Sequence, residues 1–188
     1  ITEEKEKCNL RISKIQGNIK KLEERKRIKY EFETKINSLT FENRKNDFLL
    51  YKKILDEYRD YSYIQIPLTV YDEYDIGGIK VFQKLVAAET TGVDFESKCN
   101  VASVVWNRLY SEKYPNNIID VIYQRDGSVQ FTPTYDGRID TVEVNDDDVL
   151  AIEYTYMFGS TVYDCIAFDN VKGNSWNKNK LEVVFTDS

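Results

Sequence analysis

The sequence predicts a helical arm followed by a small α+β domain, and three observations lead to this division. Residues 1–60 carry a net charge of +4, whereas the remainder carries −10. Proline is absent before Pro67, and Gly17 is the only glycine before Gly77, so nothing interrupts a long helix in the first region. Beyond residue 61 the chain is rich in aromatic residues and alternates short helical patterns with turn residues and β-prone runs.

The arm, residues 1–60, is predicted to form a coiled coil or a helical hairpin. Apolar residues recur at spacings of three and four in the first part of the arm: Ile12, Ile15, Ile19, Leu22. The apolar stripe then resumes from Ile28, out of register with these four residues. Two arrangements fit this pattern, a single long coiled-coil arm or an antiparallel hairpin with its turn near residues 37–46. Either leaves apolar surface within residues 10–58 for self-association or for a partner helix.

Residues 61–78 are predicted to be an extended linker, because β-prone residues alternate around Pro67 and lead to a Gly77-Gly78 hinge. Residues 79–188 form the predicted domain. Its first helix spans 79–91 and ends at Gly92, and Asp94 caps the next. The remaining elements follow in order: a short helix from residue 115, a loop or small hairpin over 127–137, a helix from 145 to 159, and strands over 162–168 and 181–185.

The composition excludes several classes of chemistry. The chain has no histidine, which removes Ser-His-Asp and Cys-His nucleophilic sites and histidine-ligated zinc. Its three scattered cysteines (Cys8, Cys99, Cys165) form neither a disulfide framework nor a zinc cluster, so we predict no metal and no cofactor. The acidic domain would repel nucleic acid, and no apolar run reaches the roughly 20 residues of a membrane span. The acidic run 146–148 is assigned to helix initiation.

Glu89 is the candidate catalytic residue. On the predicted helix it shares one face with Phe82, Leu85 and Val86. A carboxylate on an apolar face is costly unless it is neutral or paired, and desolvation raises its pKa, as a general acid at neutral pH requires. The alternative is a helix-end glutamate that reaches solvent or binds neighbouring backbone.

The segments around Glu89 resemble the SleB-type cell wall hydrolase family. The family has a helix ending in Glu-Ala-Arg-Gly-Glu and a second helix reading Val-Ala-x-Val-x-x-Asn-Arg, where this chain has 85–92 (LVAAETTG) and 101–109 (VASVVWNRL). Further segments agree in order over residues 79–185: 113–118 (KYPNNI), 121–124 (VIYQ), 130–133 (QFTP), 136–139 (DGRI), and 167–170 (AFDN) with Trp176. The family's Arg and second Glu are replaced by Thr91 and Val93.

The resemblance implies a mainly helical fold with a small β-sheet, related to lysozymes and lytic transglycosylases, with its acid at Glu89. Ordinary glycoside hydrolysis uses two carboxylates. A lytic transglycosylase needs one, which protonates the leaving oxygen and then accepts the proton of the muramic acid 6-hydroxyl. For a hydrolytic route the second carboxylates are Asp94, Glu96 and Asp136, which are otherwise a helix cap, a helix surface residue and a turn residue.

Several residues are predicted to support the site. Gln130 and Thr132 can bind the N-acetyl group or position the substrate. Three aromatic residues can stack on sugar rings, or else pack in the core: Tyr123, Tyr135, Trp176. Asn107 is a candidate substrate contact, or binds a loop backbone beside the site, and Arg108 is expected to pair with an acid.

We therefore predict an enzyme that cleaves the glycan strands of peptidoglycan as a lytic transglycosylase. Its substrate places it outside the cytoplasmic membrane, in a cell wall, a spore wall or a phage-derived particle. The alternative is a non-catalytic protein that binds wall glycan or acts as a coiled-coil scaffold in an envelope, spore or phage-derived assembly. In a third reading, the arm folds back over the substrate groove that Glu89 would line with residues 130–135, and keeps the enzyme inactive until a partner binds the arm.

Overall fold

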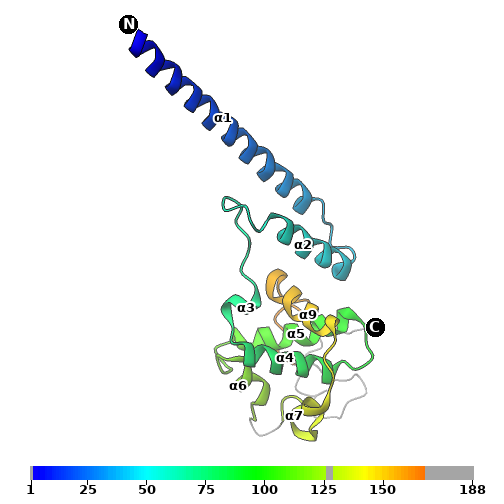
Figure 1. The fold of residues 1–188 in the computed structure, drawn as a ribbon. Coiled ribbons are helices and arrows are strands. Elements are labelled where there is room, and N and C mark those ends of the chain that lie inside the picture. The colour runs from blue at the N-terminus through cyan, green and yellow to red at the C-terminus, as the bar shows by residue number, and fades with distance from the viewer. Residues whose placement is uncertain (1, 126–128, 168–188) are drawn as a thin grey trace. The chain divides into compact units, whose positions relative to one another are not determined.

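The computed structural model describes residues 2–125 and 129–167, which fall into two compact units, unit 1 (residues 1–67) and unit 2 (residues 68–188). Every regular element in the described residues is a helix (Figure 1). Unit 1 contains α1 (Thr2–Asn37) and α2 (Arg44–Tyr58). Unit 2 contains the others: α3 (Val70–Glu73), α4 (Ile76–Glu89), α5 (Phe95–Leu109), α6 (Ile118–Tyr123), α7 (Pro133–Asp136), α8 (Arg138–Thr141) and α9 (Asp146–Phe158).

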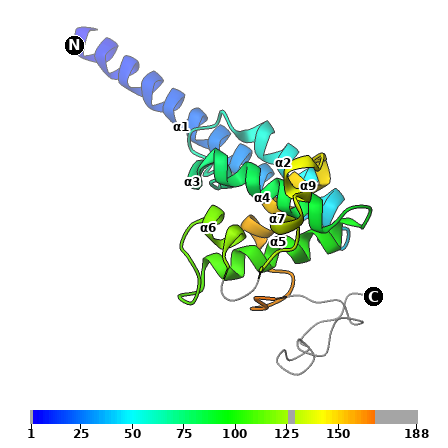
Figure 2. The ribbon, with the colours of Figure 1, turned by 90° about the horizontal axis from the view of Figure 1, so that it is seen from below.

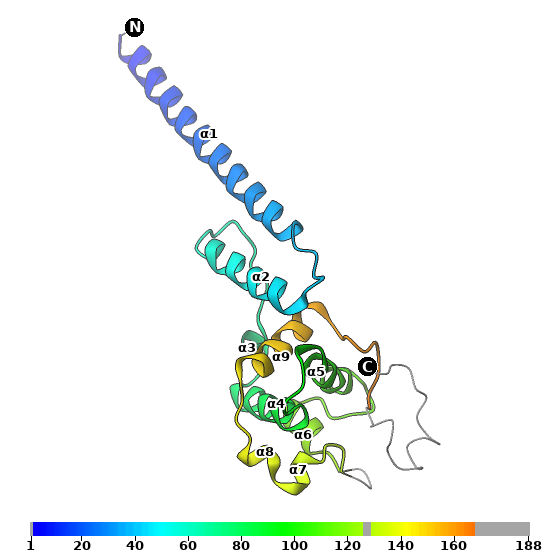
Figure 3. The same ribbon diagram turned by 90° about the vertical axis from the view of Figure 1, so that its right-hand side faces the viewer.

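Unit 1 is a helical hairpin at the C-terminal end of a long helix. α2 begins at the cap residue Asn43 and runs back along the last turns of α1. The rings of Phe32 and Tyr58 lie 5.2 Å apart, and Lys35 forms a 2.5 Å ion pair with Glu57. The first part of α1 continues beyond this contact as a single exposed helix (Figure 3).

The predicted extended linker over residues 61–78 is wrong in its second half, because α3 and the start of α4 lie within it. The carboxylate of Asp75 accepts the N–H of Gly78 at 2.9 Å and begins α4 before the glycine pair. Gly78 is buried, and a Cβ there would lie 3.5 Å from the Cβ of Ile118 in α6. This is an ordinary contact distance, so Gly78 lies inside a packed helix and is not a hinge.

The core of unit 2 is built around α5, which packs against α4, α6 and α9 (Figure 2). Trp106 of α5 packs edge-on against Phe82 of α4, with ring centroids 5.0 Å apart. Its Nε1 donates a 3.1 Å hydrogen bond to Thr155 Oγ1 of α9. The side chains that fill this core are almost fully buried: Phe82, Leu85, Val104, Val105, Ile122, Ile139, Ile152.

The predicted ends of α5 and α9 and the turn after α4 are confirmed. Asp94 accepts the N–H of Ser97 at 2.8 Å and caps α5. Asn145 caps α9 by accepting the N–H groups of the acidic run, as expected for helix initiation. Gly92 and Gly159 follow α4 and α9 with φ of +77° and +89°, a region that favours glycine.

The predicted small β-sheet is not seen in the described residues, whose single bridge joins Arg125 and Val129. Residues 162–167, expected in a strand, form no strand, because side chains of α5 bind their carbonyl groups. Asn107 Nδ2 donates to the carbonyls of Tyr163 and Cys165, both at 2.8 Å, and Arg108 Nε donates to that of Ile166 at 2.6 Å. The expected strand over 181–185 lies outside the described residues. The described fold is mainly helical, and the expected α+β class is corrected accordingly.

Candidate active site

Glu89 is the last residue of α4, and its own helix anchors it in the core. Phe82, Leu85 and Val86, on the same face, are completely buried, which fixes the position of this end of the helix. Glu89 itself is partly buried, and loss of solvent raises its pKa above the usual carboxylic range. The positive charge of Arg138 opposes this rise in pKa, and the negative charge of Asp136 adds to it.

Arg138 connects the end of α4 to α7 and α8, which lie beside it (Figure 3). Its Nη1 donates to the carbonyl of Ala88 at 3.0 Å, and its Nε donates to Asp136 Oδ2 at 2.8 Å. The backbone N–H of Arg138 donates to Asp136 Oδ1 at 3.0 Å. These bonds lower the pKa of Asp136. The site thus holds two carboxyl groups whose pKa values move in opposite directions, the pattern of an acid beside an ionised carboxylate.

The segment 130–136 carries three of the predicted substrate-binding residues next to this site. Phe131 and Pro133 are buried and anchor the segment, while Thr132 and Tyr135 face solvent and Gln130 is partly buried. Tyr135 is 72% exposed, so it does not pack in the core. An exposed flat ring beside a protonatable carboxyl group is suited to stacking on a pyranose.

The other predicted substrate residues are placed differently. Tyr123 ends α6 and is exposed, and Trp176 lies outside the described residues. Asn107 uses its amide to hold residues 160–165, donating also to Ser160 Oγ at 3.2 Å. This matches the loop-binding role expected from the sequence.

The expectation that Arg108 pairs with an acid is wrong within the described residues. Its guanidinium lies over the rings of Phe131 and Tyr114, 4.5 and 5.3 Å from their centroids. Its Nε binds the carbonyl of Ile166 at 2.6 Å. Burial lowers the pKa of Arg108. Two aromatic faces and a carbonyl group replace the expected carboxylate, and the guanidinium of Arg108 packs on the ring of the anchor residue Phe131.

Sequence reasoning missed a buried ion pair behind the end of α4. Lys98 of α5 donates to the carboxylate of Asp148 in α9 and, at 3.5 Å, to Oγ1 of Thr90, which follows Glu89. The side chains of Lys98 and Asp148 are 6% and 0% exposed. Asp148 also accepts the N–H of Asn145 at 2.8 Å. The available signal was Lys98 itself, which lies three, four and seven residues before apolar positions of the same helix face: Val101, Ala102, Val105.

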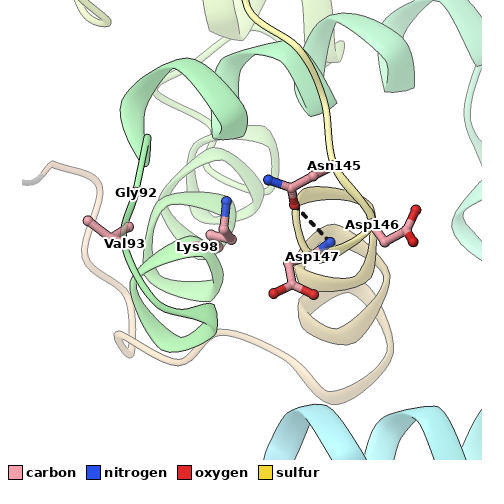
Figure 4. A pocket seen from close by; sticks show the side chains of 6 residues that line it. All are labelled: Gly92, Val93, Lys98, Asn145, Asp146 and Asp147. Carbon is pink, nitrogen blue, oxygen red and sulfur yellow. Dashed lines mark hydrogen bonds between the residues drawn. The ribbon is translucent and has the colours of Figure 1, made fainter.

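A shallow hollow opens beside this ion pair, and Figure 4 shows Lys98 directed toward the N-terminal end of α9. Its wall includes Gly92, Val93, Asn145, Asp146 and Asp147. Val93, at the position of the family's second glutamate, therefore contributes an apolar side chain here. Across the described ranges no three His, Cys, Asp or Glu side chains gather as a metal ion would require. None of the helices described is long and apolar enough to cross a membrane.

Comparisons with known proteins agree with the resemblance seen in the sequence. The cell wall hydrolase family profile matches residues 92–186, half of the chain, and Glu89 precedes the matched segment. Among solved structures, the catalytic domain of the germination-specific lytic transglycosylase SleB from Bacillus anthracis is similar, with a TM-score of 0.50. The two share 22% sequence identity over 58% of this chain and 88% of that domain, which shows a common fold. No curated protein matched. The family match, supported by the shared fold, shows that this chain belongs to the cell wall hydrolase family.

Proposed function

We propose that this protein cleaves the glycan strands of peptidoglycan, with Glu89 as the general acid. The observation that carries the proposal is the placement of Glu89. It is a carboxyl group with a raised pKa at the end of a rigid, buried helix face, and Arg138 ties that end to α7 and α8, beside the exposed segment 130–136. Family membership supports the substrate class.

The mechanism we propose is that of a lytic transglycosylase. Protonated Glu89 donates its proton to the leaving glycosidic oxygen as the C1–O bond breaks. The nearby positive charge of Arg138 stabilises the carboxylate that results, and for this reason it opposes the rise in the pKa of Glu89. The carboxylate then accepts the proton of the muramic acid 6-hydroxyl while that oxygen bonds to C1 and closes the anhydro ring. Glu89 is again protonated, and the proton balance closes.

The substrate would lie along the exposed side of segment 130–136. We propose that Tyr135 stacks on a sugar ring and that Gln130 and Thr132 bind the N-acetyl group. Tyr123, Trp176 and Asn107 remain proposed substrate contacts from the sequence, and Asn107 has the further task of holding residues 160–165. Such a substrate places the protein outside the cytoplasmic membrane, in a cell envelope, a spore wall or a phage-derived particle.

A hydrolytic route is the second candidate, because Asp136 lies close enough to Glu89 to act on its pKa. Asp94 is engaged as the cap of α5, and neither it nor Glu96 is among the charges that shift the pKa of Glu89. Of the three carboxylates considered from the sequence, Asp136 is therefore the one suited to assist a water molecule or to stabilise a cationic sugar.

The test is digestion of purified peptidoglycan by the parent protein and by Glu89→Gln, with the soluble products analysed by mass spectrometry. Glu112→Gln makes the same change at an exposed residue of unit 2 and serves as the control. We expect anhydro-muramic ends from the parent and the control. Glu89→Gln should release products at a rate that is lower by a factor of about 100 or more.

Other outcomes identify the alternatives. Reducing ends that disappear with Asp136→Asn would establish hydrolysis. A folded parent protein that binds several wall types and releases no products would instead support a glycan-binding or scaffold role. Equal product formation by the parent and Glu89→Gln would exclude Glu89 as the acid.

A further inference from the structure

The first part of α1 presents an apolar stripe, here called the seam, to solvent. The seam consists of five residues at alternating spacings of four and three: Cys8, Ile12, Ile15, Ile19, Leu22. Its four largest side chains are 47–57% exposed, and Cys8 is an exposed free thiol. A lone helix whose apolar residues face water is marginally stable, because helices draw most of their stability from packing.

The seam ends where the chain begins to pack on itself. From Ile28 onward the apolar stripe of α1 changes register, and Ile28, Phe32 and Ile36 pack against Tyr58 and the residues around it. The next two positions of the seam are the charged residues Lys26 and Lys29. The register slip thus divides α1 into a C-terminal part with a partner inside the chain and an N-terminal part with an exposed seam.

We infer that the seam pairs with the seam of a second copy of this chain, in a parallel, in-register, two-stranded coiled coil over residues 8–22. The alternating spacing is that of heptad positions a and d, with isoleucine at both a positions, Ile12 and Ile19. The d positions carry Cys8, Ile15 and Leu22. Isoleucine at a with leucine at d, as at Ile19 and Leu22, favours two strands, whereas isoleucine at both positions, as at Ile12 and Ile15, is also found in trimers. Sedimentation equilibrium therefore distinguishes two strands from three.

The charges beside the seam select the parallel orientation. In a parallel pair, Arg11 of one copy lies beside Gln16 of the other, and Asn18 lies beside Glu23, so no like charges meet. In an antiparallel pair that places Ile12 against Leu22 and Ile15 against Ile19, Arg11 of each copy would lie beside Arg25 of the other. Two arginine–arginine contacts would oppose that arrangement.

The dimer should dissociate on dilution, because the seam is short. Fifteen residues of helix extend about 22 Å, little more than two heptads. Such a contact buries less surface than the roughly 1,200–2,000 Å² of a stable specific interface. The association is therefore expected to depend on protein concentration. Where the concentration is high enough, it would link two copies of unit 2.

The first test is sedimentation equilibrium of the full chain over a range of concentrations, with two matched variants. Ile15→Glu places a charge in the seam, whereas Leu10→Glu makes the same kind of change on the opposite face of α1, at a residue that is 73% exposed. We expect a monomer–dimer equilibrium for the parent and Leu10→Glu, and a dissociation constant raised about tenfold or more for Ile15→Glu. The thermal transition of unit 2 should be the same in all three, which shows that each is folded.

Cysteine crosslinking then tests the orientation. In a Cys165→Ser background, Cys8 is the accessible thiol, because Cys99 is buried. Parallel pairing brings the two Cys8 residues face to face, and glutathione disulfide should oxidise both thiols to one interchain disulfide while it is reduced to two glutathione molecules. Antiparallel pairing would separate them by about 27 Å, since Cys8 would then lie opposite Lys26.

Each contrary result overturns a stated part of the inference. A parent chain that stays monomeric at all concentrations, or an Ile15→Glu variant that dimerises like the parent, would exclude the seam as the interface. A trimer would exclude two strands, and a dimer that forms no Cys8 disulfide would exclude the parallel register.

Discussion

Replacing Lys98 with methionine removes the positive partner of a completely buried carboxylate. In the parent, Asp148 binds Lys98 and the N–H of Asn145, and Lys98 reaches Thr90 beside the candidate acid. Methionine fills a similar volume, so the main change is the loss of charge and of hydrogen bonds. Removing one member of a buried ion pair typically costs about 3–5 kcal/mol. Because Asp148 keeps its bond from Asn145, we expect the lower end, about 3 kcal/mol.

For a unit of this size, a loss of about 3 kcal/mol corresponds to a fall of roughly 12 °C in melting temperature. Guanidinium unfolding followed by tryptophan fluorescence measures the free energy of unfolding. Both tryptophans, Trp106 and Trp176, belong to unit 2, so the signal reports on that unit. Lys113→Met makes the same change at an exposed lysine and should alter the free energy by no more than about 0.5 kcal/mol.

The double variant Lys98→Met/Asp148→Asn separates a missing partner from a packing defect. The asparagine would retain an acceptor for the N–H of Asn145 and would carry no charge, so we expect about 2 kcal/mol of the lost stability to return. The reasoning is refuted if Lys98→Met costs less than about 1 kcal/mol, because the pair would then be screened like a surface ion pair. It is also refuted if the double variant is no more stable than the single one.

Three further predictions concern α4 and the site. Burial raises the pKa of Glu89, so the stability linked to this group is present at low pH and is lost as pH rises through the raised pKa. Glu89→Gln should therefore melt at a higher temperature than the parent at pH 7.5 and at the same temperature near pH 4, and equal melting at both would contradict the burial argument. Arg138→Ala should raise the pKa of Glu89 further and move the alkaline limb of the pH–rate profile for peptidoglycan cleavage to higher pH; a shift to lower pH would be inconsistent with the assigned charge effect. Gly78→Ala should stabilise unit 2 by about 0.5–1 kcal/mol, measured by thermal unfolding, because the added methyl group meets ordinary contact distances. Gly77→Ala should gain less, since its Cβ would lie 2.8 Å from the capping carboxylate of Asp75, and the reverse order would refute the packing assignment.

The parts of the fold that follow from short-range bonds were predictable from the sequence. Asp94 and Asn145 bind N–H groups two or three residues ahead, and Gly92 and Gly159 supply the backbone conformation that the turns after their helices require. Residues 162–167, the described part of the strand expected over 162–168, form no strand. Asn107, more than 50 residues earlier, binds that backbone instead, and β-propensity carries no record of such a partner.

The same division applies to the candidate site. The sequence by itself determined that Glu89 shares a helix face with apolar residues, because helical periodicity is local. Only the tertiary structure decided which charges surround it. Arg138 binds the carbonyl of Ala88 across 50 residues, and Lys98 meets Asp148 across the same separation. The pKa of a carboxyl group depends on burial and on charges within a few ångströms, whatever their separation along the chain, so that part of the chemistry is set only when the helices pack.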